Sequence, residues 1–222
     1  MPEAWMNFLH IFCLDDYMLH EFNDVIRPGA LIVDVGAFLG FFTLRVGLMM
    51  GKQGLIVAVE PNPLAREILY DNLSLNGFEE ISRVDPRPVC GERGWRELII
   101  TGYWALSSIN PKYVDTMGER AIKKVRLPCI TLRDLLYSHG AKKVDLLKLD
   151  IEGGEAEVIE RGFIDKVLER HMVRSMIVEL HLFPDNDEKT LYSLARLLRE
   201  TGYDVFEINP LDNSRQVIVA IK

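Results

Sequence analysis

The chain has 222 residues, of which 48% are hydrophobic and 27% are charged, and its formal net charge is −7. This length and composition suit one globular domain with a sizeable core. The acidic balance weighs against a protein that holds nucleic acid on a broad basic face, and no apolar run is long enough to predict a membrane span.

The first part of the chain predicts helices that alternate with strands. Residues 1–28 predict a helical segment ahead of a main domain of residues 29–222, because helical spacing of apolar residues stops at Pro28 and Gly29. Beyond it, short apolar runs rich in β-branched residues predict buried strands. The predicted elements are a strand at 30–35, a helix at 40–50, a strand at 54–60, a helix that begins after Asn62 and ends at Gly77, and a weaker strand at about 81–84.

Residues 85–130 break this rhythm. Segments 96–101 and 123–130 predict two strands of an antiparallel pair. Between them, residues 102–122 show no clear periodicity. Long irregular loops in compact domains are often lids or binding loops, so we expect this stretch to cover a ligand site.

The alternation then returns and predicts the fold class. Strands are expected at 144–150 and 173–181, helices at 131–140, 153–162 and 185–202, and a closing hairpin at 203–208 and 215–222. Such a pattern predicts an α/β fold with a mostly parallel sheet, helices on both faces and a C-terminal antiparallel hairpin. Ligands of such sheets lie at the carboxyl ends of the strands, where Asp34, Glu60, Asp150 and Glu179 are expected.

The three cysteines, Cys13, Cys90 and Cys129, are odd in number and far apart, and they form no CxxC pair. This pattern predicts neither a disulfide framework nor a zinc site. It favours a reducing, cytoplasmic compartment.

The loop after the first strand, Gly36 to Gly40, differs from a dinucleotide loop. Phe38 takes the place of the glycine that would approach a pyrophosphate, and Asp34 would repel one. Glu60, twenty residues after Gly40, can bind both hydroxyls of a ribose. A nucleoside with a cationic amino-acid tail and no phosphate meets these conditions, which favours S-adenosylmethionine. A dinucleotide, or a turn with a structural role alone, remains the alternative.

Five motifs together resemble the FkbM-type methyltransferases, over roughly residues 29–181. They are VDVGAFLGFFT, VEPNP, ITLRDLL, DLLKLDIEGGE and IVELH, in that order. The resemblance implies a single-domain, Rossmann-like class I methyltransferase with a seven-stranded sheet. It also implies S-adenosylmethionine as methyl donor and a hydroxyl acceptor on a small molecule, a sugar or a lipid.

The resemblance also implies which residues bind the cofactor. Asp34, Gly36 and Gly40 would hold its methionine end, Thr43 would order the loop, and Glu60 would bind the ribose. Phe38 and the pair Cys90-Gly91 depart from the common residues of the family, which puts the adenine contacts in question. The full predicted set is Asp34, Gly36, Ala37, Phe38, Gly40, Thr43, Glu60, Pro61, Asn62, Val89, Cys90 and Asp150.

Transfer of a methyl group to a hydroxyl needs a base. We expect His181, which follows a strand end, to take the proton, with Asp150 and Glu152 as competing bases. The alternatives are a local hydrogen-bonding role for His181 and a helix-terminal role for Glu152. These residues and Glu179 could ligate a divalent cation, but no metal-spacing motif is present, so no metal is predicted.

Other functions stay open from the sequence. The chain could methylate RNA or protein, although its acidic balance and the LDIE sequence, where base N-methylases carry an NPPY-type motif, count against RNA. It could also be an inactive cofactor-binding module or a dehydrogenase. The sequence leaves oligomerisation open.

Overall fold

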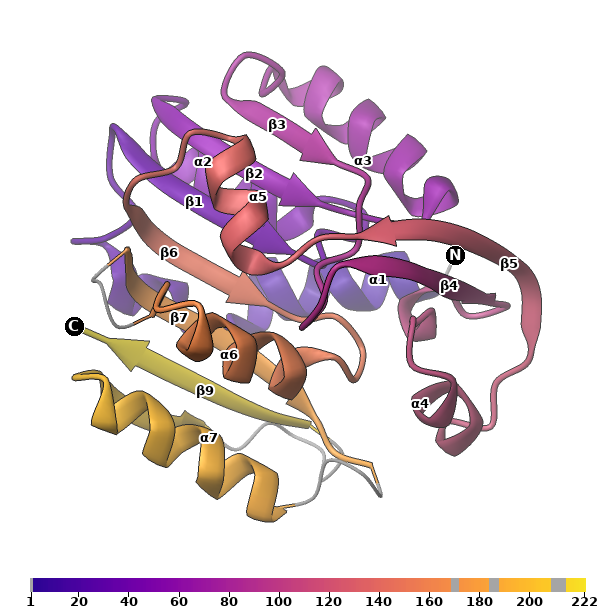
Figure 1. The fold of residues 1–222 in the computed structure, drawn as a ribbon. Helices are drawn as coiled ribbons and strands as arrows, with labels where there is room; N and C mark the ends of the chain where they lie inside the picture. Colours follow the sequence, from indigo (N-terminus) through magenta and orange to yellow (C-terminus); the bar gives the residue numbers. More distant parts are fainter. Residues whose placement is uncertain (1, 169–171, 184–187, 209–214) are drawn as a thin grey trace.

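A computed structural model describes residues 2–168, 172–183, 188–208 and 215–222. Its centre is a seven-stranded sheet of order β3-β2-β1-β6-β7-β9-β8 (Figure 1). Neighbours from β3 to β7 pair in parallel, and β9 pairs antiparallel with both β7 and β8. The expected fold class is therefore confirmed. The strands are β1 Ala30–Val35, β2 Gly54–Val59, β3 Ser82–Asp85, β6 Val144–Leu149, β7 Val173–His181, β8 Asp204–Ile208 and β9 Arg215–Ile221.

The central strands are buried on both faces because successive side chains point to opposite sides. In β1, Ile32 packs with helix α2 and the N-terminal segment, whereas Val33 and Val35 pack in the cluster that holds α5, α6 and α7. Figure 1 shows α5 and α6 in front of the sheet and α1 and α2 behind it. The helices of the main domain are α2 Phe41–Met49, α3 Pro63–Asn76, α5 Leu132–Ser138, α6 Glu155–Ile164 and α7 Glu188–Glu200.

The N-terminal segment is helical, as predicted. It comprises α1 Pro2–Phe8, a π-helical stretch η1 Leu9–Leu14 and a 3₁₀ turn η2 Leu19–Phe22. Tyr17 and Phe22 are buried in the same cluster as Ile32 of β1. The segment thus packs directly on one face of the sheet. A domain boundary after residue 28 stays a prediction.

A two-stranded antiparallel hairpin of β4 Gly94–Thr101 and β5 Ala121–Cys129 lies beyond the carboxyl ends of the parallel strands (Figure 1). The stretch 102–122 is more regular than expected, because it holds a short 3₁₀ turn, η3 Trp104–Leu106, and helix α4 Pro111–Thr116. Asn110 caps α4 by accepting hydrogen bonds from two backbone amides. The same Asn-Pro pair opens α3 and was available as a signal in the sequence.

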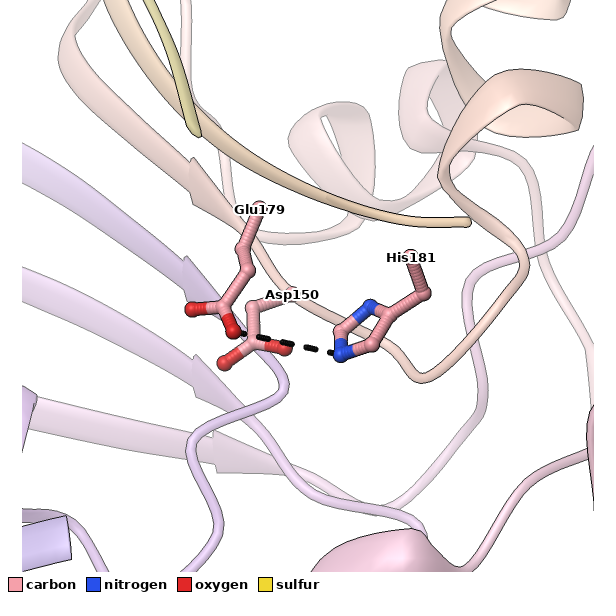
Figure 2. A group of neighbouring side chains, drawn as sticks. All are labelled: Asp150, Glu179 and His181. Atoms are coloured by element: carbon pink, nitrogen blue, oxygen red, sulfur yellow. Dashed lines mark ion pairs between the residues drawn. The ribbon is translucent and has the colours of Figure 1, made fainter. Parts of the chain in front are cut away.

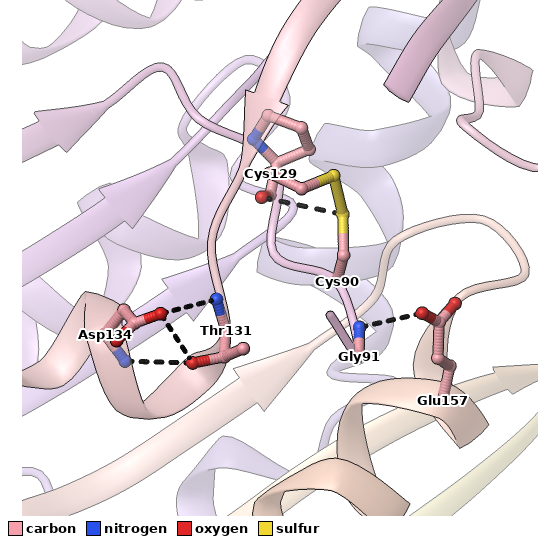
Figure 3. The surroundings of a disulfide bond; sticks show 7 residues. Cys90, Gly91, Cys129, Thr131, Asp134 and Glu157 are labelled. Atoms are coloured by element: carbon pink, nitrogen blue, oxygen red, sulfur yellow. Dashed lines mark hydrogen bonds between the residues drawn. A yellow bond between two sulfur atoms is a disulfide. The ribbon is translucent and has the colours of Figure 1, made fainter. Parts of the chain in front are cut away.

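The prediction of no disulfide is wrong, because Cys90 and Cys129 are bonded (Figure 3). The hairpin returns β5 alongside the segment that follows β3, and the Cys90 amide donates to the Ile130 carbonyl at 2.9 Å. This pairing depends on tertiary structure and not on sequence spacing. Cys13 is free and exposed. The bridge removes the cysteine argument for a reducing compartment, and the cytoplasmic location stays a prediction.

The chain runs from β1 outward to β2 and β3 and then returns to β6 on the other side of β1. This switch point leaves a crevice outside the carboxyl ends of β1 and β6, where ligands of doubly wound sheets bind. Asp34 and Asp150 lie at these two strand ends. Within the described residues, no helix has both the length and the apolar composition needed to cross a membrane.

Candidate active site

A cavity of about 430 Å³ opens at this switch point. Its wall brings together most of the residues predicted from the sequence, but it does not include Asp34, Gly40, Thr43 or Cys90. Direct ligand contact by these four residues, as expected from the motif positions, is not supported by this wall. The predicted residues that do line the cavity are Gly36, Ala37, Phe38, Glu60, Pro61, Asn62, Val89, Asp150, Glu152 and His181.

The loop after β1 approaches the end of β6 closely. Gly36 has φ of +85°, and a Cβ atom there would lie 1.6 Å from the Asp150 carbonyl oxygen. Only glycine can therefore occupy this position without moving the backbone. Phe38 also has a positive φ, of 50°, which is rare for an aromatic residue. Its amide donates to Oε2 of Glu60 at 2.7 Å, so the carboxylate stabilises this conformation.

Glu60 and Asn62 form the other side of the first loop. Oε1 of Glu60 accepts a hydrogen bond from the Asn62 amide at 2.7 Å. Burial raises the pKa of Glu60 to about 7, although two backbone amides stabilise its charge. The Asn62 side-chain oxygen caps α3 at Leu64, but its buried Nδ2 has no partner in the described part of the chain. A ligand acceptor at this end of the cavity would complete the pairing of Asn62.

Asp34 and Thr43 lie beneath the loop. Thr43 Oγ1 donates to Asp34 at 2.6 Å, and both side chains are fully buried. Burial raises the pKa of Asp34, against the nearby charge of Lys148 at 3.6 Å. Asp34 and Thr43 therefore lie behind the cavity wall, where they hold the loop and Lys148 in place.

Lys148 connects the loop to the end of β6. Its Nζ donates to the Gly36 carbonyl at 2.8 Å and lies 3.0 Å from Asp150. Burial lowers the pKa of this lysine, but the charges of Asp150 and Asp34 outweigh that effect and raise it. The sequence analysis missed this residue. A lysine between the leucines of the strand VDLLKLD was the available signal, because buried lysines are almost always paired.

His181 is held between two carboxylates. Its Nδ1 lies 3.1 Å from Glu155 and its Nε2 lies 3.1 Å from Glu152. Burial lowers the pKa of His181, but these carboxylates outweigh it and hold the pKa well above the ordinary value. Because both ring nitrogens face acceptors, the imidazole is held as a cation that donates from both sides.

Glu152 is the carboxylate that this arrangement presents to the cavity. Its φ of +58° places it in the left-handed region, and the Tyr113 hydroxyl donates to its Oε2. Burial raises the pKa of Glu152 to about 8, in spite of the facing charge of His181. Strained backbone at a cavity wall is a common feature of functional sites.

The stretch 102–122 is tied to this turn. Ser108 Oγ donates to the Glu152 carbonyl at 2.6 Å, and Asn110 Nδ2 donates to the Gly153 carbonyl at 3.1 Å. Tyr113 is almost fully buried against the ring of His181. The second half of the expected lid therefore supports Glu152.

Asp150, Glu179 and His181 bring their ligand atoms close together, as Figure 2 shows. Such a group resembles a divalent-cation site. However, Asp150 is paired with Lys148, and Glu179 lies 2.8 Å from Arg215. The cluster is therefore already neutralised by the protein's own cations, which removes the electrostatic reason to place an ion there.

The Tyr17 hydroxyl links the two carboxylates of this cluster. It donates to Glu179 at 2.7 Å and to Asp150 at 3.1 Å. Tyr17 comes from the N-terminal segment, where the sequence suggested only helix packing. No local pattern marks it, since its partners lie more than 130 residues away in the chain.

Comparisons with known proteins agree with this geometry. A sequence model of the FkbM methyltransferase domain matches residues 34–205, which is more than half of the chain. A search of curated proteins found no match. Among solved structures, a methyltransferase FkbM from Methylobacillus flagellatus has a TM-score of 0.59 and 14% identity, and the match covers 87% of this chain and 44% of that chain.

Two human structures are also similar. A human methyltransferase 10 domain containing protein has a TM-score of 0.57 and 15% identity, covering 92% of this chain and 79% of that one. The N-terminal domain of human METTL16 in complex with SAH has a TM-score of 0.52 and 14% identity, and the match covers 96% of this chain and 68% of that chain. At these identities the likeness concerns the fold. The chain spans less than half the length of the bacterial protein.

Proposed function

The chain belongs to the FkbM methyltransferase family, and on that premise we propose that it transfers a methyl group from S-adenosylmethionine to a hydroxyl of a small molecule, a sugar or a lipid. One observation carries the proposal. A single cavity has Glu60 and the unpartnered amide of Asn62 at one end and the Glu152–His181 pair at the other. It thus offers one set of groups to a nucleoside and another to a nucleophile.

The residues present fit the cofactor. Glu60 would bind the ribose hydroxyls, since a carboxylate oxygen that accepts one backbone hydrogen bond can accept a second. The orphaned Nδ2 of Asn62 would donate to an acceptor of the nucleoside. Pro88 and Val89 line the cavity and would contact the adenine. The absence of a side chain at Gly36 lets the loop backbone lie close to the Asp150 carbonyl, and both residues line the cavity.

The charge of the cavity suits a cation. Its wall holds six carboxylate side chains and two permanent cations, Lys148 and Arg215. Burial raises the pKa of Asp150, but the charges of Lys148 and His181 and the hydrogen bonds from Lys148 and Tyr17 together outweigh burial and lower it, so the carboxyl stays ionised. When bound, S-adenosylmethionine would supply an activated methyl group on a sulfonium: the acceptor oxygen would bond to the methyl carbon as the carbon–sulfur bond breaks, with S-adenosylhomocysteine as the leaving group. The protein aligns the acceptor and excludes water, effects that together supply about 7 kcal/mol or more of barrier reduction.

We assign the proton acceptor to Glu152. A carboxylate whose pKa is about 8 is a stronger base than an ordinary carboxylate and is matched to neutral solution. His181 and Tyr113 both donate to it and would fix its orientation toward the acceptor hydroxyl. The base expected from the sequence was His181. Because both of its ring nitrogens face carboxylates, His181 is a positioning residue in this proposal. Asp150 is paired with Lys148 and is therefore a weaker candidate for the base.

The test has two steps. Calorimetry should detect binding of S-adenosylmethionine and S-adenosylhomocysteine and none of NAD. A screen with S-adenosylmethionine labelled in its methyl group should then transfer label to hydroxyl compounds and not to RNA or protein. Binding of NAD in place of S-adenosylmethionine would sink the cofactor assignment, and label found in RNA or protein would sink the acceptor assignment.

A further inference from the structure

The N-terminal segment, defined from here on as residues 2–17, turns a polar face toward the cavity. Glu3, Asn7 and His10 are spaced by four and three residues, which places them on one face of a helix, and all three line the cavity. Trp5, on the opposite face, is 64% exposed. Met6 and Ile11 of the same segment also line the cavity, so its wall here is mixed. The three polar side chains give this part of the wall hydrogen-bonding groups that a polar occupant can use.

Glu3 supplies a second and independent observation. Its side chain lines the cavity and the residue is only 5% exposed. Within the part of the chain that the structure describes, its carboxylate has no hydrogen-bond or ion-pair partner. A carboxylate accepts several hydrogen bonds, so Glu3 has unused capacity to bind donors from a ligand in the cavity.

Tyr17 connects this face to the reaction end of the cavity. Its ring packs edge-on against Phe42, and its hydroxyl donates to Asp150 and Glu179. The segment lies wholly before residue 34, where the family match begins. The π-helical turn between α1 and Tyr17 is a feature that often marks functional sites. The residues of this segment that line the cavity therefore lie outside the part of the chain that the family model matches.

The charges that line the cavity select against an anionic acceptor. Two permanent cations, Lys148 and Arg215, each lie within 3.0 Å of a carboxylate. Phosphate binding relies on charge-assisted hydrogen bonds from such groups, which are engaged here. A hydroxyl compound instead donates to carboxylates. Those in the wall are Glu3, Asp16, Glu60, Asp150, Glu152 and Glu179.

We propose that the N-terminal segment forms an acceptor subsite for a hydroxyl compound that carries no phosphate or carboxylate, with Glu3 and Asn7 binding its hydroxyl groups. The inference rests on the proposed function, because it names the acceptor side of the same cavity.

The experiment uses the full chain saturated with S-adenosylhomocysteine. Saturation-transfer NMR compares methyl α-D-glucopyranoside, an uncharged polyol, with glucose 6-phosphate. Methyl α-D-glucopyranoside should bind with a Kd in the millimolar range, and glucose 6-phosphate should bind at least about tenfold more weakly. Asn7→Ala should weaken the uncharged sugar about fivefold, the ratio for one lost hydrogen bond, whereas the matched control Asn23→Ala should not.

A second pair of variants tests the charge. Glu3→Gln should reduce the ratio of the two affinities, uncharged sugar over glucose 6-phosphate. The exposed control Glu21→Gln should leave this ratio unchanged. Affinity for S-adenosylhomocysteine should stay within about twofold of wild type in all four variants. The inference is overturned by equal or tighter binding of the phosphate, by no binding of either sugar, or by equal effects of Asn7→Ala and Asn23→Ala. Loss of S-adenosylhomocysteine binding in the wild type would instead refute the proposed function.

Discussion

Nε2 of His181 lies 3.1 Å from Oε2 of Glu152, while the other ring nitrogen faces the fully buried Glu155. An imidazole held in this way cannot accept a further proton from a substrate, because neither nitrogen is open. Glu152 lines the cavity and is the member of the pair that a substrate can reach. The relationship moves the proposed base from the histidine to its carboxylate partner.

Glu152→Gln should lower turnover by about 10²–10⁴-fold, the range for loss of a general base, and leave affinity for S-adenosylhomocysteine nearly unchanged. Single-turnover methyl transfer and calorimetry give the two quantities. Exposed Glu160→Gln on α6 is the matched control. If Glu152→Gln stays active and His181→Ala loses its activity, the histidine is the base after all.

The pH dependence of kcat/KM distinguishes the same two groups. Glu152 must be ionised to accept a proton, and its pKa is about 8. The rate should therefore rise with pH and level off above about 8. The pKa of His181 is also raised, so variants tell the two groups apart: a rise that persists in Glu152→Gln and disappears in His181→Gln would point to His181.

Stability should fall as the pH rises above about 6.5, the pKa of histidine in the unfolded chain. The pKa of folded His181 is raised, so its contribution is fully present below the unfolded pKa and is lost as pH rises through the folded one. The pKa of Glu152 is raised too, which gives the same sign. Urea denaturation at pH 6 and pH 9 should show a smaller decline for the double variant Glu152→Gln/His181→Gln than for wild type. Equal declines would refute the pairing.

Lys148→Met should destabilise the protein by about 3–5 kcal/mol, because it leaves the buried carboxylates of Asp34 and Asp150 without their cation. Thermal and urea unfolding measure the loss. Exposed Lys143→Met is the control and should change stability by less than about 0.5 kcal/mol. A mild effect at Lys148 would mean that the carboxylates are protonated in the fold.

Glu60→Ala should weaken S-adenosylhomocysteine binding by about 1–3 kcal/mol, the range for charge-assisted hydrogen bonds. The loss has two sources, since Glu60 also holds the amides of Phe38 and Asn62. Calorimetry on Glu60→Ala and on the exposed control Glu67→Ala separates this effect from general destabilisation. Unchanged affinity would remove Glu60 from the cofactor site.

Hydrogen exchange should divide the stretch 102–122 in two. Amides of Ser108 to Thr116 should exchange slowly, because Ser108, Asn110 and Tyr113 are bonded to the turn that carries Glu152. Residues 102–106 lack such bonds to that turn and should exchange faster until cofactor and acceptor bind. Uniform fast exchange over the whole stretch would restore the simple lid predicted from the sequence.

Much of the fold could be predicted because each central strand is buried on both faces. Runs such as ALIVDV and GLIVAV show this in a few residues, and Gly40 and Gly51 bound the helix between them. Helix α4 was missed because it is too short to show a period, although Asn110 and Pro111 marked its start.

The cavity wall was less predictable because it depends on contacts between distant segments. Strand ends placed Glu60, Asp150 and His181 correctly at one rim. The partners that set their chemistry, Tyr17 and Lys148, have no motif of their own. The bond between Cys90 and Cys129 was missed for the same reason, since hairpin geometry brings the two residues together.

The place of β9 in the sheet has a consequence for synthesis of the chain. β8 pairs with β9, and β9 pairs with β7, so β9 separates two strands that precede it in sequence. A ribosome delivers β7 and β8 first. Until β9 has emerged, β7 can pair only with β6, and β8 has no neighbouring strand. The exposed edge of β7 must meanwhile stay open, and an open apolar edge invites pairing with other chains. Changes that weaken β9 beyond Arg215, which lines the cavity, should therefore lower the soluble yield of newly made protein while the cavity wall is unchanged.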